Sequence, residues 1–118
     1  MKKTAFIILA AGEEPESLGR VVNALTGALE YKDSGQDVQI IFDGAGTQAA
    51  AAFADPDHKF NNLFEQVRHF VRGACKHCSN AFEVTEKIEK GGIPLIDEFQ
   101  GHPSFRNLLG EDFDILIF

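Results

Sequence analysis

The chain has 118 residues, of which 44% are hydrophobic and 25% charged, a composition typical of a folded domain and not of a disordered chain. Eighteen acidic against eleven basic side chains give a net charge of −7. This balance argues against binding to nucleic acid or to an anionic membrane, because phosphates are neutralised by clustered Lys and Arg. The length corresponds to one domain over residues 1–118.

The N-terminal stretch MKKTAFIILAAG has some features of a secretory signal, since two lysines precede an apolar run and small residues. That run, residues 5–11, is at the short limit of roughly 7 residues for such a signal, and Glu13, Glu14 and Pro15 then introduce a helix. We therefore favour a buried strand over residues 4–10, apolar like strands covered on both faces of a parallel sheet. No run approaches the roughly 18 apolar residues of a membrane span. We place the protein in the cytoplasm.

Strands and helices are expected to alternate along the rest of the chain. Apolar residues at helical spacing predict a helix over residues 15–32. Further strands are expected at residues 38–42, 70–75, 93–96 and 113–118, and further helices at residues 47–54, 60–67, 76–82 and 103–109, with another turn or two of helix up to residue 90. At residues 70–75 a continued helix is the alternative, but the β-formers Phe70 and Val71 and the helix breaker Gly73 favour a strand. This order predicts a three-layer, flavodoxin-like α/β fold with a mostly parallel five-stranded sheet.

Ligands of parallel sheets bind beyond the carboxyl ends of the strands. Three expected loops end there: residues 11–14, residues 43–47 and the segment around Cys75. Gly12, Asp43 and Gly44 are therefore candidate ligand-binding residues. The GAGT sequence at 44–47 has the look of a phosphate loop, but Asp43 would repel a phosphate, so we interpret it as a tight turn. Thr47 is expected to cap the helix that follows.

The sequence RGACKHC, residues 72–78, contains both cysteines. From residue 66 to 82 there are three basic side chains and two histidines but no acid, so this segment is a positive island in an acidic chain. Arg72, Lys76 and a helix start beside Cys75 would favour the thiolate, which is the nucleophilic form of cysteine. A reactive sulfur centre is the favoured interpretation.

Inert packing and a metal site are the alternatives for the cysteine pair. Zinc needs four ligands, and a lone CxxC motif supplies two, so a metal site within one chain is disfavoured. His102 precedes Pro103 and is expected in a loop beside a helix start, where it could contact a ligand; a structural role is favoured. A thioredoxin-type site is disfavoured as well, because here the cysteines follow two complete strand–helix units.

The chain resembles the DsrE/DsrF-like family of sulfur-relay proteins over essentially its whole length. The resemblance rests on LGRVVNAL (18–25), VQIIFDGAGT (38–47), GACKHCSNAF (73–82) and IPLIDEFQGHPSF (93–105). It implies a flavodoxin-like three-layer fold, a cytoplasmic protein and small oligomers, often trimers or hexamers. It also implies that a cysteine at the strand end, matched by Cys75, carries persulfide sulfur to a partner. Cys78 departs from the pattern, because relay members commonly act with one cysteine.

The resulting hypothesis is a sulfur carrier or sulfurtransferase in which Cys75 holds persulfide sulfur and Cys78 is a resolving thiol. Arg72 and Lys76 would stabilise the thiolate, and His77 would act as a proton shuttle. A non-catalytic oligomeric module that binds a small ligand or partner, and a thiol–disulfide redox protein, are the alternatives. We expect no cofactor. The expected partners are further copies of the chain, as a dimer, trimer or hexamer, and a sulfur donor or acceptor protein.

Overall fold

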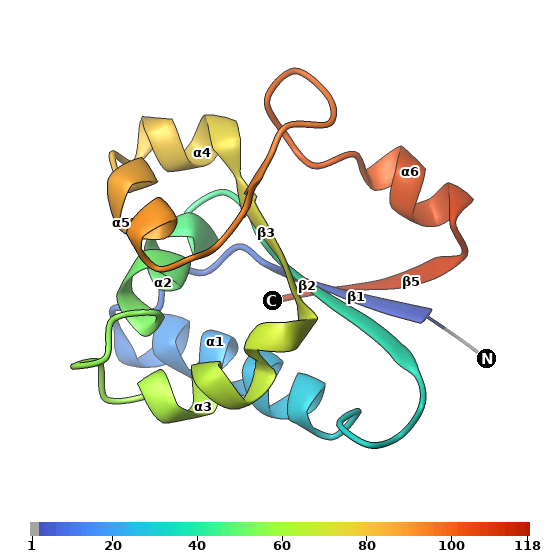
Figure 1. Cartoon of the computed structure of the whole chain (residues 1–118), viewed down its shortest axis with the longest axis horizontal. Coiled ribbons are helices and arrows are strands. Elements are labelled where there is room, and N and C mark those ends of the chain that lie inside the picture. Colours follow the sequence, from blue (N-terminus) through green and yellow to red (C-terminus); the bar gives the residue numbers. More distant parts are fainter. Residues whose placement is uncertain (1–2) are drawn as a thin grey trace.

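The computed structural model describes residues 3–118 and contains one five-stranded sheet with helices against both of its faces (Figure 1). The strands are β1 (Lys3–Ile8), β2 (Asp37–Phe42), β3 (Val71–Cys75), β4 (Leu95–Ile96) and β5 (Phe113–Ile117). The helices are α1 (Pro15–Leu29), α2 (Gly46–Phe53), α3 (Asn61–Val67), α4 (Lys76–Ala81), α5 (Thr85–Lys90) and α6 (Phe105–Gly110), with a 3₁₀ turn, η1 (Arg68–Phe70). The predicted α/β fold is confirmed, and all five strands lie close to their expected positions. Within the described residues, no helix is both long enough and apolar enough to cross a membrane.

The strand order is β4-β3-β2-β1-β5, and every neighbouring pair is parallel. The chain moves outward from β1 to β4 and then crosses back to place β5 on the other side of β1. Because such crossovers are right-handed, reversing the direction moves the connecting helix to the opposite face. Figure 1 accordingly shows α6 on one side of the sheet and α1, α2 and α3 on the other. The order differs from the 2-1-3-4-5 order of flavodoxin itself.

The core has one part on each face of the sheet. On the larger side, Phe42, Phe53 and Phe64 are fully buried, and each contributes roughly 1.5–3 kcal/mol by leaving water. The smaller part, under α6, consists of Ala5, Ile7, Ile41, Ile96, Leu108 and Phe113. Alternate residues of β1 enter the two parts, which explains why its sequence is apolar throughout.

The GAGT segment forms the tight turn that the sequence predicted. The backbone N–H of Gly46 donates to the carbonyl of Asp43 at 2.8 Å, and a Cβ on Gly46 would lie only 1.9 Å from the carbonyl oxygen of Ile8. The predicted cap is wrong: α2 begins at Gly46, and Thr47 Oγ1 donates to the carbonyl of Gly44 at 2.8 Å instead. The turn therefore holds the end of β2 directly against β1.

Candidate functional site

The two cysteines lie together where β3 passes into α4. Cys75 is the last residue of β3 and the N-cap of α4, and its Sγ accepts a hydrogen bond from the backbone N–H of Cys78 at 3.4 Å. Ser79 Oγ donates to the carbonyl of Cys75 at 2.7 Å and fixes the turn. Both thiols are free; Cys75 is fully buried and Cys78 is half-buried. Because Cys78 follows Cys75 by three residues at the start of a helix, the two sulfurs lie close together.

Asp43 and His102 complete a group of four side chains, which we call the cysteine cluster: Asp43, Cys75, Cys78 and His102. The Cys78 thiol donates to Asp43 Oδ1 at 3.6 Å, and Cys75 Sγ lies 3.2 Å from His102 Nδ1. One ligand atom from each of the four lies within 4.8 Å of the others. All four residues lie at or beyond the carboxyl ends of strands β2, β3 and β4. Asp43 and the cysteines therefore lie at the edge of the sheet where the sequence predicted a site.

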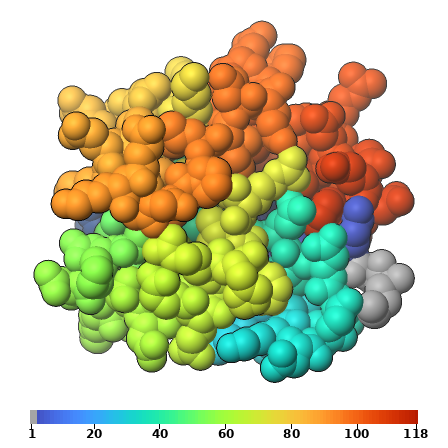
Figure 2. Space-filling view, in the orientation of Figure 1, coloured from blue at the N-terminus to red at the C-terminus, as the bar shows by residue number. Residues whose placement is uncertain are grey.

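The loop that carries His102 is held in place by hydrogen bonds at both ends. Within it, Gly101 N–H donates to Asp97 Oδ1 at 3.0 Å, and Phe99 and His102 pair as a short antiparallel bridge. Toward α4, the N–H of His77 donates to the Gly101 carbonyl at 2.8 Å, and the Cys75 thiol lies 3.5 Å from the same oxygen. Figures 1 and 2 show this loop, in orange, projecting beside α4. His102 is therefore positioned by backbone contacts and not only by its own side chain.

The cluster disfavours a thiolate on Cys75. Burial raises the pKa of this thiol from the ordinary 9.0 to about 12; the Cys78 N–H lowers the pKa in part, while the Cys78 side chain and the Asp43 charge raise it. The expected stabilisation by Arg72 and Lys76 is wrong, because both point to acids from later in the chain. Arg72 pairs with Glu98 and also donates to Gln39, and Lys76 Nζ lies 3.5 Å from Asp97. The positive island of the sequence is neutralised in the fold.

The other predicted site residues have different places. Gly44 lies next to the cluster, since its N–H donates to Asp43 Oδ1 at 2.8 Å. His77 is exposed, and its ring centroid lies 4.6 Å from that of His102. Gly12 packs against Phe53 and Val21, and its N–H donates to Ser17. Asp43 and Gly44 therefore lie at the cysteines, and His77 lies beside His102. Gly12 packs against other residues and is not part of the cysteine cluster.

His102 has more than the structural role favoured from the sequence, because its ring belongs to the cysteine cluster. Its signal was present, because it follows the carboxyl end of a predicted strand by a few residues, as Asp43 does. The CxxC motif also does not lack further candidate metal ligands, because Asp43 and His102 bring the group to four.

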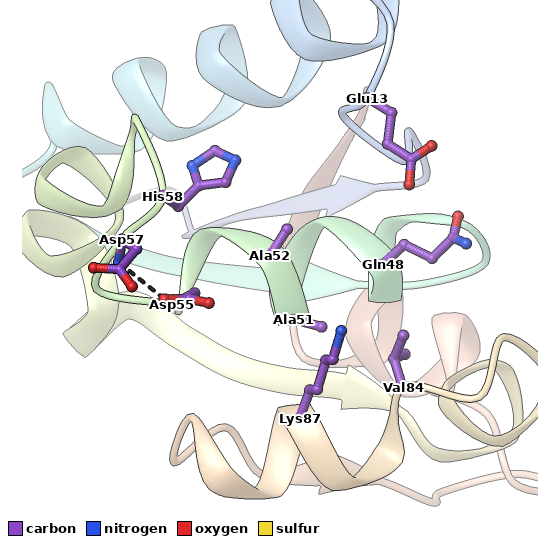
Figure 3. A pocket seen from close by; sticks show the side chains of 9 residues that line it. All are labelled: Glu13, Gln48, Ala51, Ala52, Asp55, Asp57, His58, Val84 and Lys87. Atoms are coloured by element: carbon purple, nitrogen blue, oxygen red, sulfur yellow. Dashed lines mark hydrogen bonds between the residues drawn. The ribbon is translucent and has the colours of Figure 1, made fainter.

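A surface pocket is present elsewhere (Figure 3). Its lining contains Glu13, Gln48, Ala51, Ala52, Asp55, Asp57, His58, Val84 and Lys87, and none of the cysteine cluster. In Figure 3, Lys87 reaches from α5 toward α2, while Asp55 and Asp57 lie at the far end of α2. The N–H of Asp57 donates to Asp55 Oδ1 at 2.9 Å, so this pair serves the turn itself. We take the cysteine cluster as the candidate site.

Fold and site together define a parallel α/β protein with two free thiols, an imidazole and a carboxylate at the carboxyl edge of its sheet. No family model matches the sequence. The chain is similar to uncharacterized protein MJ0733 of Methanocaldococcus jannaschii, with 29% identity over 116 residues that cover 97% of this chain and 93% of the relative. It is also similar to the solved structure of BT1422 from Bacteroides thetaiotaomicron, a conserved protein of unknown function. That comparison has a TM-score of 0.68 at 21% identity and covers 98% of this chain and 95% of the other. The second comparison shows a shared fold.

Proposed function

We propose that the protein carries or transfers sulfane sulfur at the Cys75–Cys78 pair, as the resemblance to sulfur-relay proteins suggests. The observation that supports this best is the graded exposure of two free thiols whose sulfurs lie within 4.8 Å of each other. Cys78, half-buried, meets the solvent, whereas Cys75 is fully buried beside His102. A sulfur bound on the outer thiol is thus within reach of the inner one. The proposal retains the cytoplasm as the compartment, where free thiols persist.

Because Cys78 is more exposed than Cys75, we reverse the roles that the sequence suggested: Cys78 attacks the donor and Cys75 acts second. In the first step, the Cys78 thiolate attacks the terminal sulfur of a persulfide donor, RS–SH. The donor S–S bond breaks, RSH leaves and Cys78 carries the persulfide. Oxidation states are unchanged in total, because the sulfane sulfur moves from one thiol to another.

The second step is intramolecular, and His102 Nδ1, 3.2 Å from the Cys75 sulfur, is placed to accept the thiol proton. Attack of Cys75 on the terminal sulfur moves the persulfide to Cys75. Attack on the inner sulfur instead forms the Cys75–Cys78 disulfide and releases hydrosulfide, so two thiols are oxidised and one sulfane sulfur is reduced. A cellular dithiol would then reduce the disulfide. Proximity compensates for the raised pKa of Cys75.

Persulfide labelling of single variants tests these roles. Trypsin cleaves after Lys76 and so separates Cys75 from Cys78 into different peptides. After incubation with a persulfide donor, Cys78→Ser should lose most of the label, whereas Cys75→Ser should retain a persulfide on Cys78 and release no hydrosulfide. The double variant is the blank. A wild-type protein that neither carries a persulfide nor releases hydrosulfide, or a Cys75→Ser variant that remains unlabelled, would contradict the proposal.

The burial of Cys75 also favours a second candidate, a non-catalytic module that binds a ligand or partner. In that case neither thiol should accept sulfur, and both should react with a thiol reagent only after denaturation. A third reading, thiol–disulfide exchange, would be supported by a reduction potential of the pair near the cytosolic poise.

We also propose that the chain forms a homo-oligomer. Large apolar side chains are exposed on the face that carries α6 and along the edge strand β5: Phe105, Leu109, Leu116 and Ile117. Phe105 and Leu109 are 44% and 62% exposed, and Leu116 and Ile117 are 46% and 64% exposed. Several large apolar side chains exposed around one edge of a folded protein commonly mark a contact surface. Self-association would cover it without any further partner.

A further inference from the structure

The cysteine cluster has the donor set of a zinc site. It offers two thiols, one imidazole nitrogen and one carboxylate oxygen, from the turn after β2, the junction of β3 with α4 and the loop after β4. Sulfur and imidazole ligands select borderline-soft cations such as Zn²⁺, whereas Ca²⁺ and Mg²⁺ prefer sites made of oxygen ligands alone. Four protein ligands also match the tetrahedral coordination that zinc adopts in closed sites.

The distances fit this coordination. With metal–ligand bonds of about 2.0–2.3 Å, the ligands of a tetrahedral zinc lie roughly 3.3–3.8 Å apart. Cys75 Sγ lies 3.2 Å from His102 Nδ1, and Cys78 Sγ lies 3.6 Å from Asp43 Oδ1. The largest separation in the cluster is within 4.8 Å, so closure around an ion requires movements of about 1 Å.

The charge of Asp43 supplies an independent argument. This carboxylate is only 8% exposed, and none of the ion pairs formed within residues 3–118 includes it. Its Oδ1 accepts hydrogen bonds from the Gly44 N–H and the Cys78 thiol, both uncharged donors. A buried carboxylate without a cation is costly, and cations or metals are the usual compensation. Here one carboxylate oxygen lies within 4.8 Å of both sulfurs and of a ring nitrogen of His102.

We propose that Asp43, Cys75, Cys78 and His102 bind one Zn²⁺ ion. On binding, each thiol releases a proton and each sulfur gives an electron pair to the metal, while His102 binds through neutral Nδ1. The inference does not depend on the proposed sulfur chemistry. The two proposals compete for the same atoms, because sulfurs bound to Zn²⁺ are less available to attack a persulfide donor.

Metal titration of the full, reduced, metal-free chain tests the site. Zn²⁺ is added in competition with a chromophoric chelator, and Co²⁺ is used as a spectroscopic probe of the ligands. We expect one ion per chain, thiolate-to-cobalt charge-transfer bands and tetrahedral d–d bands, with both thiols protected from alkylation by bound Zn²⁺. Asp43→Asn and His102→Gln, which are close in shape to the native residues, should each weaken binding by about 10- to 100-fold or more, since even outer-shell substitutions have effects of that size. The exposed His69→Gln is the matched control and should bind as the wild type does.

Several outcomes would overturn the proposal. These are the absence of stoichiometric binding by the wild type, a cobalt spectrum without thiolate bands, or binding that survives both Asp43→Asn and His102→Gln. The last result would indicate a site made of thiols alone, shared between chains. If a cluster variant does not fold, the wild-type stoichiometry still separates the two sites, because one ion per chain supports the proposed site and one ion per two chains contradicts it. Persulfide labelling of the same metal-free preparation is scored separately, so failure of the zinc site and failure of the sulfur chemistry are distinguished.

Discussion

Raising the pH should make Cys75 reactive in a range far above that of an ordinary thiol. Burial raises its pKa from 9.0 to about 12. At pH 8 this leaves roughly one thiolate in ten thousand molecules, against about one in ten for a thiol with a pKa of 9.0. Ionisation alone therefore slows alkylation about a thousandfold, and the fully buried position of the sulfur slows it further. The rate should rise about tenfold per pH unit from pH 8 to pH 11.

Peptide-resolved alkylation measures this directly in the wild-type protein. Native, metal-free chain is pulsed with iodoacetamide at a series of pH values, quenched, and cut with trypsin, which places Cys75 in residues 73–76 and Cys78 in residues 77–87. Denatured protein gives the reference rate at each pH. A rate for Cys75 that is already half-maximal near pH 7 or 8 would refute the reasoning, because it would show a stabilised thiolate.

The raised pKa of Cys75 also makes the free energy of unfolding depend on pH. Between pH 9 and about 12 the unfolded chain has lost the Cys75 proton while the folded chain retains it, so the free energy of unfolding falls as the pH rises. The contribution is fully present below pH 9, and its loss is up to about 1.4 kcal/mol per pH unit within this window. Urea unfolding at pH 8, 9 and 10 measures it. Cys75→Ser should lack this part of the decline, and an identical slope in the variant would contradict the prediction.

Two further predictions concern the scaffold and the surface. Gly46→Ala should destabilise the protein by about 3 kcal/mol or more in urea unfolding, because the new Cβ would lie 1.9 Å from the Ile8 carbonyl oxygen. Its matched control is Gly19→Ala in α1, where nothing lies within 4 Å of the new Cβ; this variant should gain about 0.4–1 kcal/mol, and equal effects of the two would refute the close approach. Leu109→Asp, at a side chain that is 62% exposed, should shift the oligomer toward the monomer in sedimentation velocity without lowering stability. A wild-type protein that sediments as a monomer would end the proposal of self-association.

Local patterns in the sequence were sufficient to predict the α/β class and its strands and helices, but not the strand order. The apolar run at the start of the chain became the central strand β1, and the helical spacing after Pro15 became α1. The ambiguous segment at residues 70–75 is a strand, as Phe70, Val71 and Gly73 favoured. These features depend on neighbours a few residues apart, so one sequence is enough to read them. The predicted helix ended three residues late, at 32 instead of Leu29, because only turns follow.

The chemistry of the site depends on contacts between distant residues, and there the sequence was insufficient. The segment around Cys75 is rich in basic residues, as the sequence shows. In the fold, however, Glu98, which lies 26 residues after Arg72, pairs with Arg72 and neutralises its charge. The complete burial of Cys75 is likewise produced by the loop after β4 and by the turn at Asp43. His102 reaches the cysteines only because β3 and β4 are parallel neighbours, a register that no local pattern encodes.

The pairing of β1 with β5 links the two ends of the described chain. β1 lies between β2 and β5, and its residues Lys3 to Ile7 pair with Phe113 to Ile117. During synthesis, one edge of this apolar strand therefore has no partner until more than a hundred further residues have been made. Unpaired strand edges in such intermediates favour aggregation, and late pairings of this kind slow folding. Until β5 has been synthesised, the nascent chain therefore exposes one unpaired edge of β1.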